Sequence, residues 1–365
     1  MNQTINSYYI NRLIDYINSG LENENIHIKL DYKYERIMPK LQKKNNTILY
    51  SRRYEIFTFL FLNGNFEIVL DYFFAIESFI NRQYIVSSFF LRSLKRRMRM
   101  CSLLMNIKSL CRTNLHKYML QFTILHEIAH AIYNSKTELK EEAFKIIDKD
   151  LSRFKKNIKR DIGDSIYNKD LKKKRRILET KIGVKNIATE MTVDKLKSQI
   201  EFDETIIQNI RHKEELACDL YSLCLSIQMF EDTKDEKSIL IFYKASMSAL
   251  ALATRYNYLL RRYVKMQDDE RYSKNNDAEL LRIFFYLNEC IFGALSRDIP
   301  TKDFYNYTKQ LTCDWIHNVV NYINSNLDII SKQNNVSQCD DQYQKDLLEE
   351  EILCFEDKFV SKWLS

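Results

Sequence analysis

Residues 122–133 read Phe-Thr-Ile-Leu-His-Glu-Ile-Ala-His-Ala-Ile-Tyr, which places the pattern His-Glu-x-x-His in an otherwise apolar segment. Because a helix advances by about 100° per residue, His126 and His130 lie one turn apart on one face, and both imidazoles can reach one metal ion. The carboxylate of Glu127 then lies beside such an ion, where a general base for a water molecule belongs. The apolar neighbours predict a buried helix, and buried imidazoles need polar or metal partners. The stretch therefore predicts a metal centre.

Residues 214–225, with the sequence EELACDLYSLCL, contain a second group of candidate ligands. A narrow polar stripe recurs at helical spacing on this otherwise mostly apolar segment and consists of Glu215, Asp219, Ser222 and Ser226. Glu215 can complete a His-His-Glu zinc site, and Asp219, one turn later, can accept the free ring N–H of a liganding histidine. The spacing leaves Glu214 and His212 open as alternative third ligands.

The two motifs together, HEIAH at 126–130 and ELACD at 215–219, resemble those of the gluzincin metallopeptidases. In that family the second helix carries a glutamate ligand and, four residues later, an aspartate that orients the first histidine. The resemblance covers two short segments, about a tenth of the chain. It implies a zincin-like core in which Glu127 is the base, Asp219 orients the first histidine, and the zinc ligands are His126, His130 and Glu215.

The composition predicts a predominantly α-helical α+β fold. The chain has 365 residues, of which 45% are hydrophobic, and only five glycines and two prolines interrupt it. This length is sufficient for one elaborated domain. We expect five segments within it. They are an N-terminal helical segment (1–45), a small sheet with the His-Glu-x-x-His helix (46–135), a basic helical insertion (136–205), a helical core with the glutamate ligand (206–300) and C-terminal helices (301–365).

The predicted small sheet lies upstream of the histidine helix. Residues 54–62 (YEIFTFLFL) and 66–76 (FEIVLDYFFAI) flank an Asn-Gly-Asn turn and are interpreted as the two strands of a hairpin. Strict alternation is poor, so a helical alternative stays open. In zincin folds an edge strand pairs with an extended substrate, and the resemblance therefore implies that this hairpin forms a wall of the substrate site.

Other segments are predicted to be helical. An amphipathic helix spans Ile10 to Ile17, the helix that carries the histidines begins near Thr113 or Asn114, and two or three apolar helices follow between 206 and 300. A final helix is expected to dock on the body of the protein through a stripe made of Leu348, Ile352, Phe355, Phe359 and Trp363.

Residues 153–176 carry 11 Lys and Arg against 3 Asp, in a chain whose net charge is +7. Such a segment can bind an acidic protein surface, act as a lid or exosite for an acidic substrate, or form a solvated helical face. Only Phe154 and Tyr167 stand among these charges, too few aromatic residues for stacking on successive bases, which disfavours nucleic acid as a partner.

The sequence also predicts a cytoplasmic location. The eight cysteines form no CxxC pair, which is typical of reduced thiols. No secretory signal and no apolar stretch of about 18 residues is found, so we expect no membrane span. This separates the chain from the membrane-embedded HtpX-type gluzincins.

The predicted reaction is hydrolysis of a peptide bond in a protein substrate. Candidates for a contact with the substrate or the transition state are His212, Tyr221, Arg282 and His317. Two alternatives are a regulatory or sensor zincin of the ImmA/IrrE kind and a binding scaffold with a structural zinc. An intact Glu127 favours the peptidase, because neither alternative needs a base. Soluble phage-exclusion peptidases of the Lit type are similar in architecture, which implies a role in phage defence or a toxin-like response.

Overall fold

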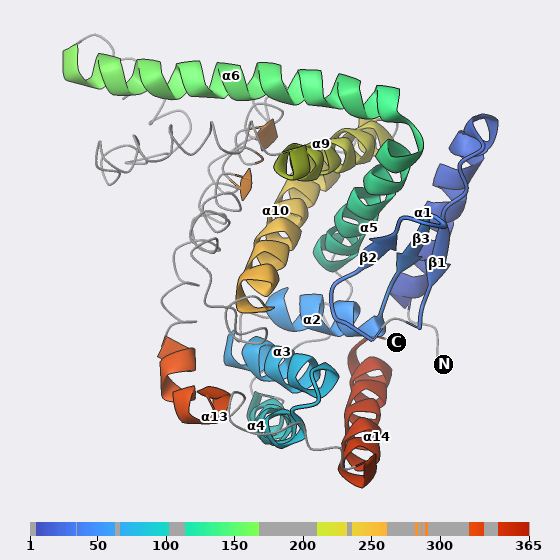
Figure 1. Cartoon of the computed structure of the whole chain (residues 1–365), viewed down its shortest axis with the longest axis vertical. Helices are drawn as coiled ribbons and strands as arrows, with labels where there is room; N and C mark the ends of the chain where they lie inside the picture. Colours follow the sequence, from blue (N-terminus) through green and yellow to red (C-terminus); the bar gives the residue numbers. More distant parts are fainter. Residues whose placement is uncertain are drawn as a thin grey trace.

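The computed structural model describes residues 5–33, 35–62, 66–101, 114–167, 210–231, 236–260, 282–283, 286, 289–290, 321–331 and 342–364. Helices predominate in this part of the chain, and one small three-stranded sheet accompanies them (Figure 1). The prediction of a mainly helical α+β fold is therefore confirmed. Within the described residues, no helix is long and apolar enough to cross a membrane.

The N-terminal helix α1 (Ile5–Leu21) is amphipathic, as predicted. Its apolar side chains at helical spacing are buried in the core and include Ile10, Leu13, Ile14 and Ile17. The helix is followed by a short 3-10 turn, η1 (Glu22–Glu24). The side chain of Asn18, near the end of α1, fixes the path of the chain beyond this turn. Its amide accepts from and donates to the backbone of Ile28 at 2.9 Å each, which positions the first strand.

The sheet consists of β1 (Lys29–Asp31), β2 (Lys40–Gln42) and β3 (Thr47–Leu49), in the order β1-β3-β2. β3 pairs in parallel with β1 and antiparallel with β2, where Leu41 lies opposite Ile48. Leu41 and Ile48 are buried, whereas Lys40 and Gln42 are exposed. β2 is thus an edge strand with one face against the core.

The predicted hairpin at residues 54–76 is wrong. The structure has two helices there, α2 (Arg52–Leu62) and α3 (Phe66–Ile80). Nearly every side chain of α2 is buried, as is every side chain of α3 from Ile68 to Ser78, so their apolar runs reflect burial on all sides rather than one sheet face. A run that is apolar all round carries no period that distinguishes a strand from a helix. The actual sheet lies earlier in the chain, still upstream of the histidine helix.

The central helix is α5 (Asn114–Ser135), which begins within the predicted boundary and carries both histidines. It contacts α1, α2, α9 (Ile210–Glu231) and α10 (Glu236–Leu259), so most of its side chains are buried. α4 (Tyr84–Cys101) packs on α3 at the opposite end of the molecule from the long helix α6 (Thr137–Tyr167) (Figure 1). The histidines therefore stand on a helix that is largely enclosed by other helices.

Helix α6 lies across the end of α5 and α9 and extends beyond them (Figure 1). Ile147 and Leu151 of α6 are buried against Leu216 and Ala217 of α9. The backbone of the basic segment is helical as far as Tyr167. The side chains from 153 onward and residues 168–176 lie outside the described residues, so the roles considered for this segment stay predictions.

The C-terminal helix α14 (Gln342–Phe359) runs into a last turn, η4 (Val360–Leu364), and a short helix α13 (Leu327–Ser331) precedes it. The predicted docking of α14 on the body of the protein is confirmed, because the stripe made of Leu348, Ile352, Phe355 and Phe359 packs against the core. A buried charge holds it in place: Glu356 accepts hydrogen bonds from the Arg53 Nε at 2.8 Å and the Arg52 Nε at 3.1 Å. The side chain of Trp363 is outside the described residues.

The Glu356→Gln variant tests this anchor. It leaves the buried Arg53 guanidinium without its carboxylate, so we expect the free energy of unfolding to fall by about 3 kcal/mol. Glu350→Gln, an exposed change on the same helix, is the control and should alter stability by less than about 0.5 kcal/mol. Urea unfolding of both variants measures the difference. Equal stability of the two variants would contradict this role of Glu356.

Candidate metal centre

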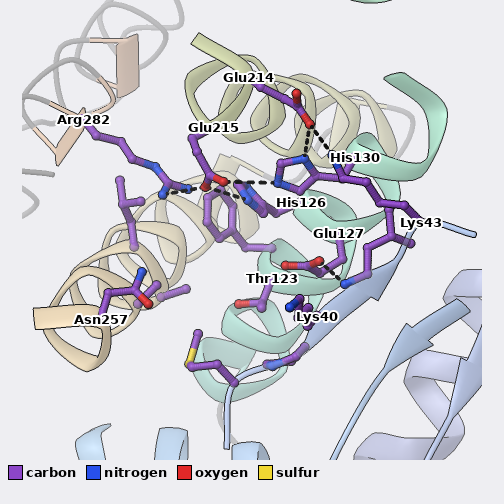
Figure 2. A pocket seen from close by; sticks show the side chains of 17 residues that line it. Lys40, Lys43, Thr123, His126, Glu127, His130, Glu214, Glu215, Asn257 and Arg282 are labelled. Atoms are coloured by element: carbon purple, nitrogen blue, oxygen red, sulfur yellow. Dashed lines mark hydrogen bonds and ion pairs between the residues drawn. The ribbon is translucent and has the colours of Figure 1, made fainter. Parts of the chain in front are cut away.

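The close packing of α5 on α9 creates the site. Small residues at the contact, Ala129 on α5 and Ala217 and Cys218 on α9, are buried together with Leu216 and Tyr133. Their size lets the two helices approach, so that the histidine face of α5 meets the carboxylates of α9. Figure 2 shows His126, His130, Glu214 and Glu215 directed toward one another across this contact.

Both histidines direct the same ring nitrogen at one carboxylate. His126 Nε2 lies 3.4 Å from Glu215 Oε2, and His130 Nε2 lies 3.5 Å from Glu215 Oε1. Donor atoms of the three residues all lie within 4.8 Å of one another. On a tetrahedral zinc ion with bonds of about 2.0–2.1 Å, two ligand atoms are about 3.3 Å apart. The set His126, His130 and Glu215 can therefore hold a metal ion, and its spacing suits zinc.

The other ring nitrogen of each histidine has a carboxylate of its own. His126 Nδ1 lies 2.9 Å from Asp219 Oδ1, and His130 Nδ1 is hydrogen-bonded to Glu214 Oε1 at 3.0 Å. Carboxylates at Nδ1 fix the ring orientation and leave Nε2 for a metal. Asp219 thus stands where the sequence analysis expects it. Glu214, one of the alternative third ligands, lies on the far side of the His130 ring from Glu215.

Glu214 links the site to two further elements. Its Oε2 lies 2.5 Å from Lys140 Nζ on α6, and its Oε1 lies 3.5 Å from Lys43 Nζ, next to β2. The hydrogen bond with His130, together with Lys140, outweighs partial burial and lowers the pKa of Glu214 to about 2. Glu214 is therefore ionised and can balance positive charge on the His130 ring.

Arg282 supplies the opposite charge on the other side. Its guanidinium contacts Asp219 through Nε at 2.5 Å and Nη2 at 2.7 Å, and Glu215 through Nη1 at 2.9 Å. Burial alone would raise the pKa of both carboxyls, but Arg282 and His126 bring each pKa below its ordinary value. Both carboxylates are consequently charged. The structure thus brings Arg282, which the sequence suggested as a contact of the substrate or the transition state, into the site.

Glu127 lies beside the donor set and bonds to the edge strand. Its Oε2 accepts a hydrogen bond from the Leu41 backbone N–H of β2 at 2.6 Å. Burial raises the pKa of Glu127, and the nearby histidines act in the opposite direction. Sequence reasoning missed this contact, because a backbone N–H leaves no signature in a residue pattern.

These residues border a cavity of about 700 Å³. Its walls come from β2 and the segment around it, α5, α9, α10 and Arg282, and Figure 2 shows its side chains. The lining residues include Pro39, Lys40, Leu41, Lys43, Phe122, Thr123, His126, Glu127, His130, Glu214, Glu215, Ala249, Ala253, Asn257 and Arg282. His212 and Tyr221 do not line it, and Tyr221 packs against the Tyr133 ring instead. His317 lies outside the described residues.

Comparison of the chain with protein-family models, with curated proteins and with solved structures finds no match. Evidence for a function therefore comes from the site itself. That site combines a three-residue donor set, a carboxylate beside it and a cavity that reaches both. Such a combination can bind a metal ion and expose it to another molecule.

We expect the purified protein to contain close to one zinc ion per chain. Three protein donors with an accessible fourth position are typical of a functional zinc site. Elemental analysis after dialysis against metal-free buffer measures the content. His126→Ala and His130→Ala should each abolish it. A protein that holds no transition metal and takes up none on addition would contradict the site.

The carboxylates should differ in their effect on zinc affinity. Glu215→Ala removes a donor and should weaken zinc by more than about 100-fold, whereas Asp219→Ala and Glu214→Ala free a histidine ring and should each weaken zinc by about 10- to 100-fold. Ser222→Ala, on the same helix but away from the donors, is the control. Competition with a chromophoric chelator gives the affinities. If Glu214→Ala were the most damaging change, Glu215 would not be the third ligand.

Proposed function

We propose that this protein is a zinc-dependent endopeptidase. The observation that carries the proposal is the position of Glu127, a half-buried carboxylate beside the His126, His130 and Glu215 donors and on the wall of the same cavity. A metal that only stabilises the fold needs neither an adjacent carboxylate nor an accessible cavity. A hydrolytic site needs both.

The residues divide the chemistry between them. His126, His130 and Glu215 would hold a zinc ion, which would supply a Lewis acid for the scissile carbonyl and lower the pKa of a water molecule. Glu127 takes the proton of the attacking water and passes it to the leaving amine. Burial raises the pKa of the Glu127 carboxyl above its ordinary value, which makes it a better proton acceptor, and the Leu41 N–H keeps the carboxylate oriented. Asp219 and Glu214 hold the two imidazoles in place.

Arg282 is the residue that we assign to a substrate carbonyl. It lines the cavity, and its guanidinium is held by Asp219 and Glu215. A cation fixed in this way can stabilise negative charge on an oxygen without reorganising. His212 and Tyr221 are less suitable, because neither lines the cavity.

The regulatory zincin and the scaffold with a structural zinc remain the competing functions, and nothing in the geometry favours either over hydrolysis. The resemblance to Lit-type peptidases, and with it a role in phage defence or a toxin-like response, stays a prediction. So does the cytoplasmic location.

Glu127→Gln separates these functions. The change removes the base and keeps the shape of the side chain, so hydrolysis should fall by about 100-fold or more while zinc content and melting temperature hardly change. Digestion of a synthetic peptide mixture by the zinc-loaded protein, followed by mass spectrometry, measures the rate. Glu138→Gln, an exposed change on α6, is the control. Wild-type turnover by Glu127→Gln, or no zinc-dependent cleavage by the wild-type protein, would contradict a peptidase.

A further inference from the structure

The backbone of β2 offers little to a bound peptide. Because the Leu41 N–H donates to Glu127, it points away from β3, and in an antiparallel pair the neighbours Lys40 and Gln42 then direct their N–H groups toward β3. Residue 39 faces the same way as residue 41, but it is proline and has no N–H. Of residues 39–42, none therefore presents a free N–H to the cavity. Recognition at this wall depends on carbonyl groups and side chains.

The side chains of this wall are cationic. Lys40 and Lys43 both line the cavity, and Figure 2 shows them on the β2 side, beside Glu127. Lys40 is exposed and forms no ion pair within the described part of the chain. Lys43 is 59% exposed and lies 3.5 Å from Glu214, a carboxylate that Lys140 and His130 already contact more closely. Both ammonium groups can therefore bind a further anionic group.

The opposite wall is small and uncharged. It is the face of α10 on which Ala249, Ala253 and Asn257 recur every four residues. This side gives room to a substrate but no charge to bind it. The two lysines are thus concentrated on one wall of the cavity, whereas Arg282, the third cation of the lining, is paired with Asp219 and Glu215.

The charge balance of the cavity also favours an anionic substrate. Its lining includes three carboxylates, Glu127, Glu214 and Glu215, and three permanent cations, Lys40, Lys43 and Arg282. A divalent metal ion adds two positive charges to this balanced set. A substrate with a carboxylate near the bond to be cleaved would then be attracted, and one with a lysine there would be repelled.

We propose that this cavity selects peptides with an aspartate or glutamate close to the scissile bond, and that Lys40, assisted by Lys43, binds that carboxylate. This inference rests on the proposed peptidase function. It names the substrate class as acidic peptide segments and Lys40 as the residue that determines the specificity. An acidic residue at this wall also compensates for the backbone N–H groups that β2 does not provide.

The direct test measures binding without turnover. Zinc-loaded Glu127→Gln protein is titrated with a fluorescein-labelled octapeptide that has two central glutamates, and with the same peptide carrying two glutamines. We expect the glutamate peptide to bind about fivefold more tightly, with the difference shrinking in high salt. Lys40→Glu should reduce its affinity by about tenfold and leave the glutamine peptide nearly unaffected. Lys44→Glu, a neighbouring exposed lysine that does not line the cavity, is the matched control.

A second readout uses cleavage by the wild-type protein. Cleavage sites in a randomised peptide mixture should be enriched in Asp and Glu within two residues of the cut bond, and Lys40→Glu should abolish the enrichment while Lys44→Glu keeps it. Equal binding of the two octapeptides, including binding of neither, overturns the inference. Preferential binding of the acidic peptide without any cleavage supports it and rejects only the proposed hydrolysis.

Discussion

The contact on which the site depends is the meeting of two imidazole Nε2 atoms with the single carboxylate of Glu215. It exists because α5 and α9 pack through small residues, so that a turn of one helix faces a turn of the other. Burying these groups is unfavourable unless their charges are compensated. Asp219 and Glu214 complete the compensation on the Nδ1 side of each ring. The arrangement is thus organised around one point in space, where a bound cation would balance the converging donors.

The charges around that point explain why a divalent ion suits it. Four carboxylates gather there, those of Glu127, Glu214, Glu215 and Asp219, against the cations Arg282, Lys140 and the more distant Lys43. Burial lowers the pKa of both histidines, but hydrogen bonds with Asp219 for His126, and with Cys218 and Glu214 for His130, outweigh it and raise the pKa of each ring. An ion bound between the two Nε2 atoms would take the place of that positive charge. A metal ion is often the largest local charge in such a site and supplies what side chains cannot place at its centre. The remainder of the fold keeps these groups in position. Lys140 of α6 contacts Glu214, and the Leu41 N–H of the sheet donates to Glu127.

Much of the site could be predicted from the sequence, and the failures have physical causes. Helical spacing alone places His126 and His130 on one face, and the narrow polar stripe identifies the partner helix. It cannot decide between Glu214 and Glu215, because adjacent residues differ only in the direction in which they leave the helix. The hairpin expected at 54–76 is two helices, since both segments are buried all round and show no clear period. The real strands have three residues each and include Lys29, Asp31 and Lys40, too short and too polar for a pattern to reveal them.

X-ray absorption at the zinc edge of the purified protein tests the centre most directly. With His126 Nε2, His130 Nε2 and a Glu215 oxygen as donors, the spectrum should fit about four nitrogen and oxygen neighbours near 2.0–2.1 Å, with the outer-shell scattering of two imidazoles. Cys218 is buried nearby on α9, so a different arrangement of the helices would add sulfur at about 2.3 Å. A sulfur neighbour, or the scattering of fewer than two imidazoles, would contradict the donor set described above.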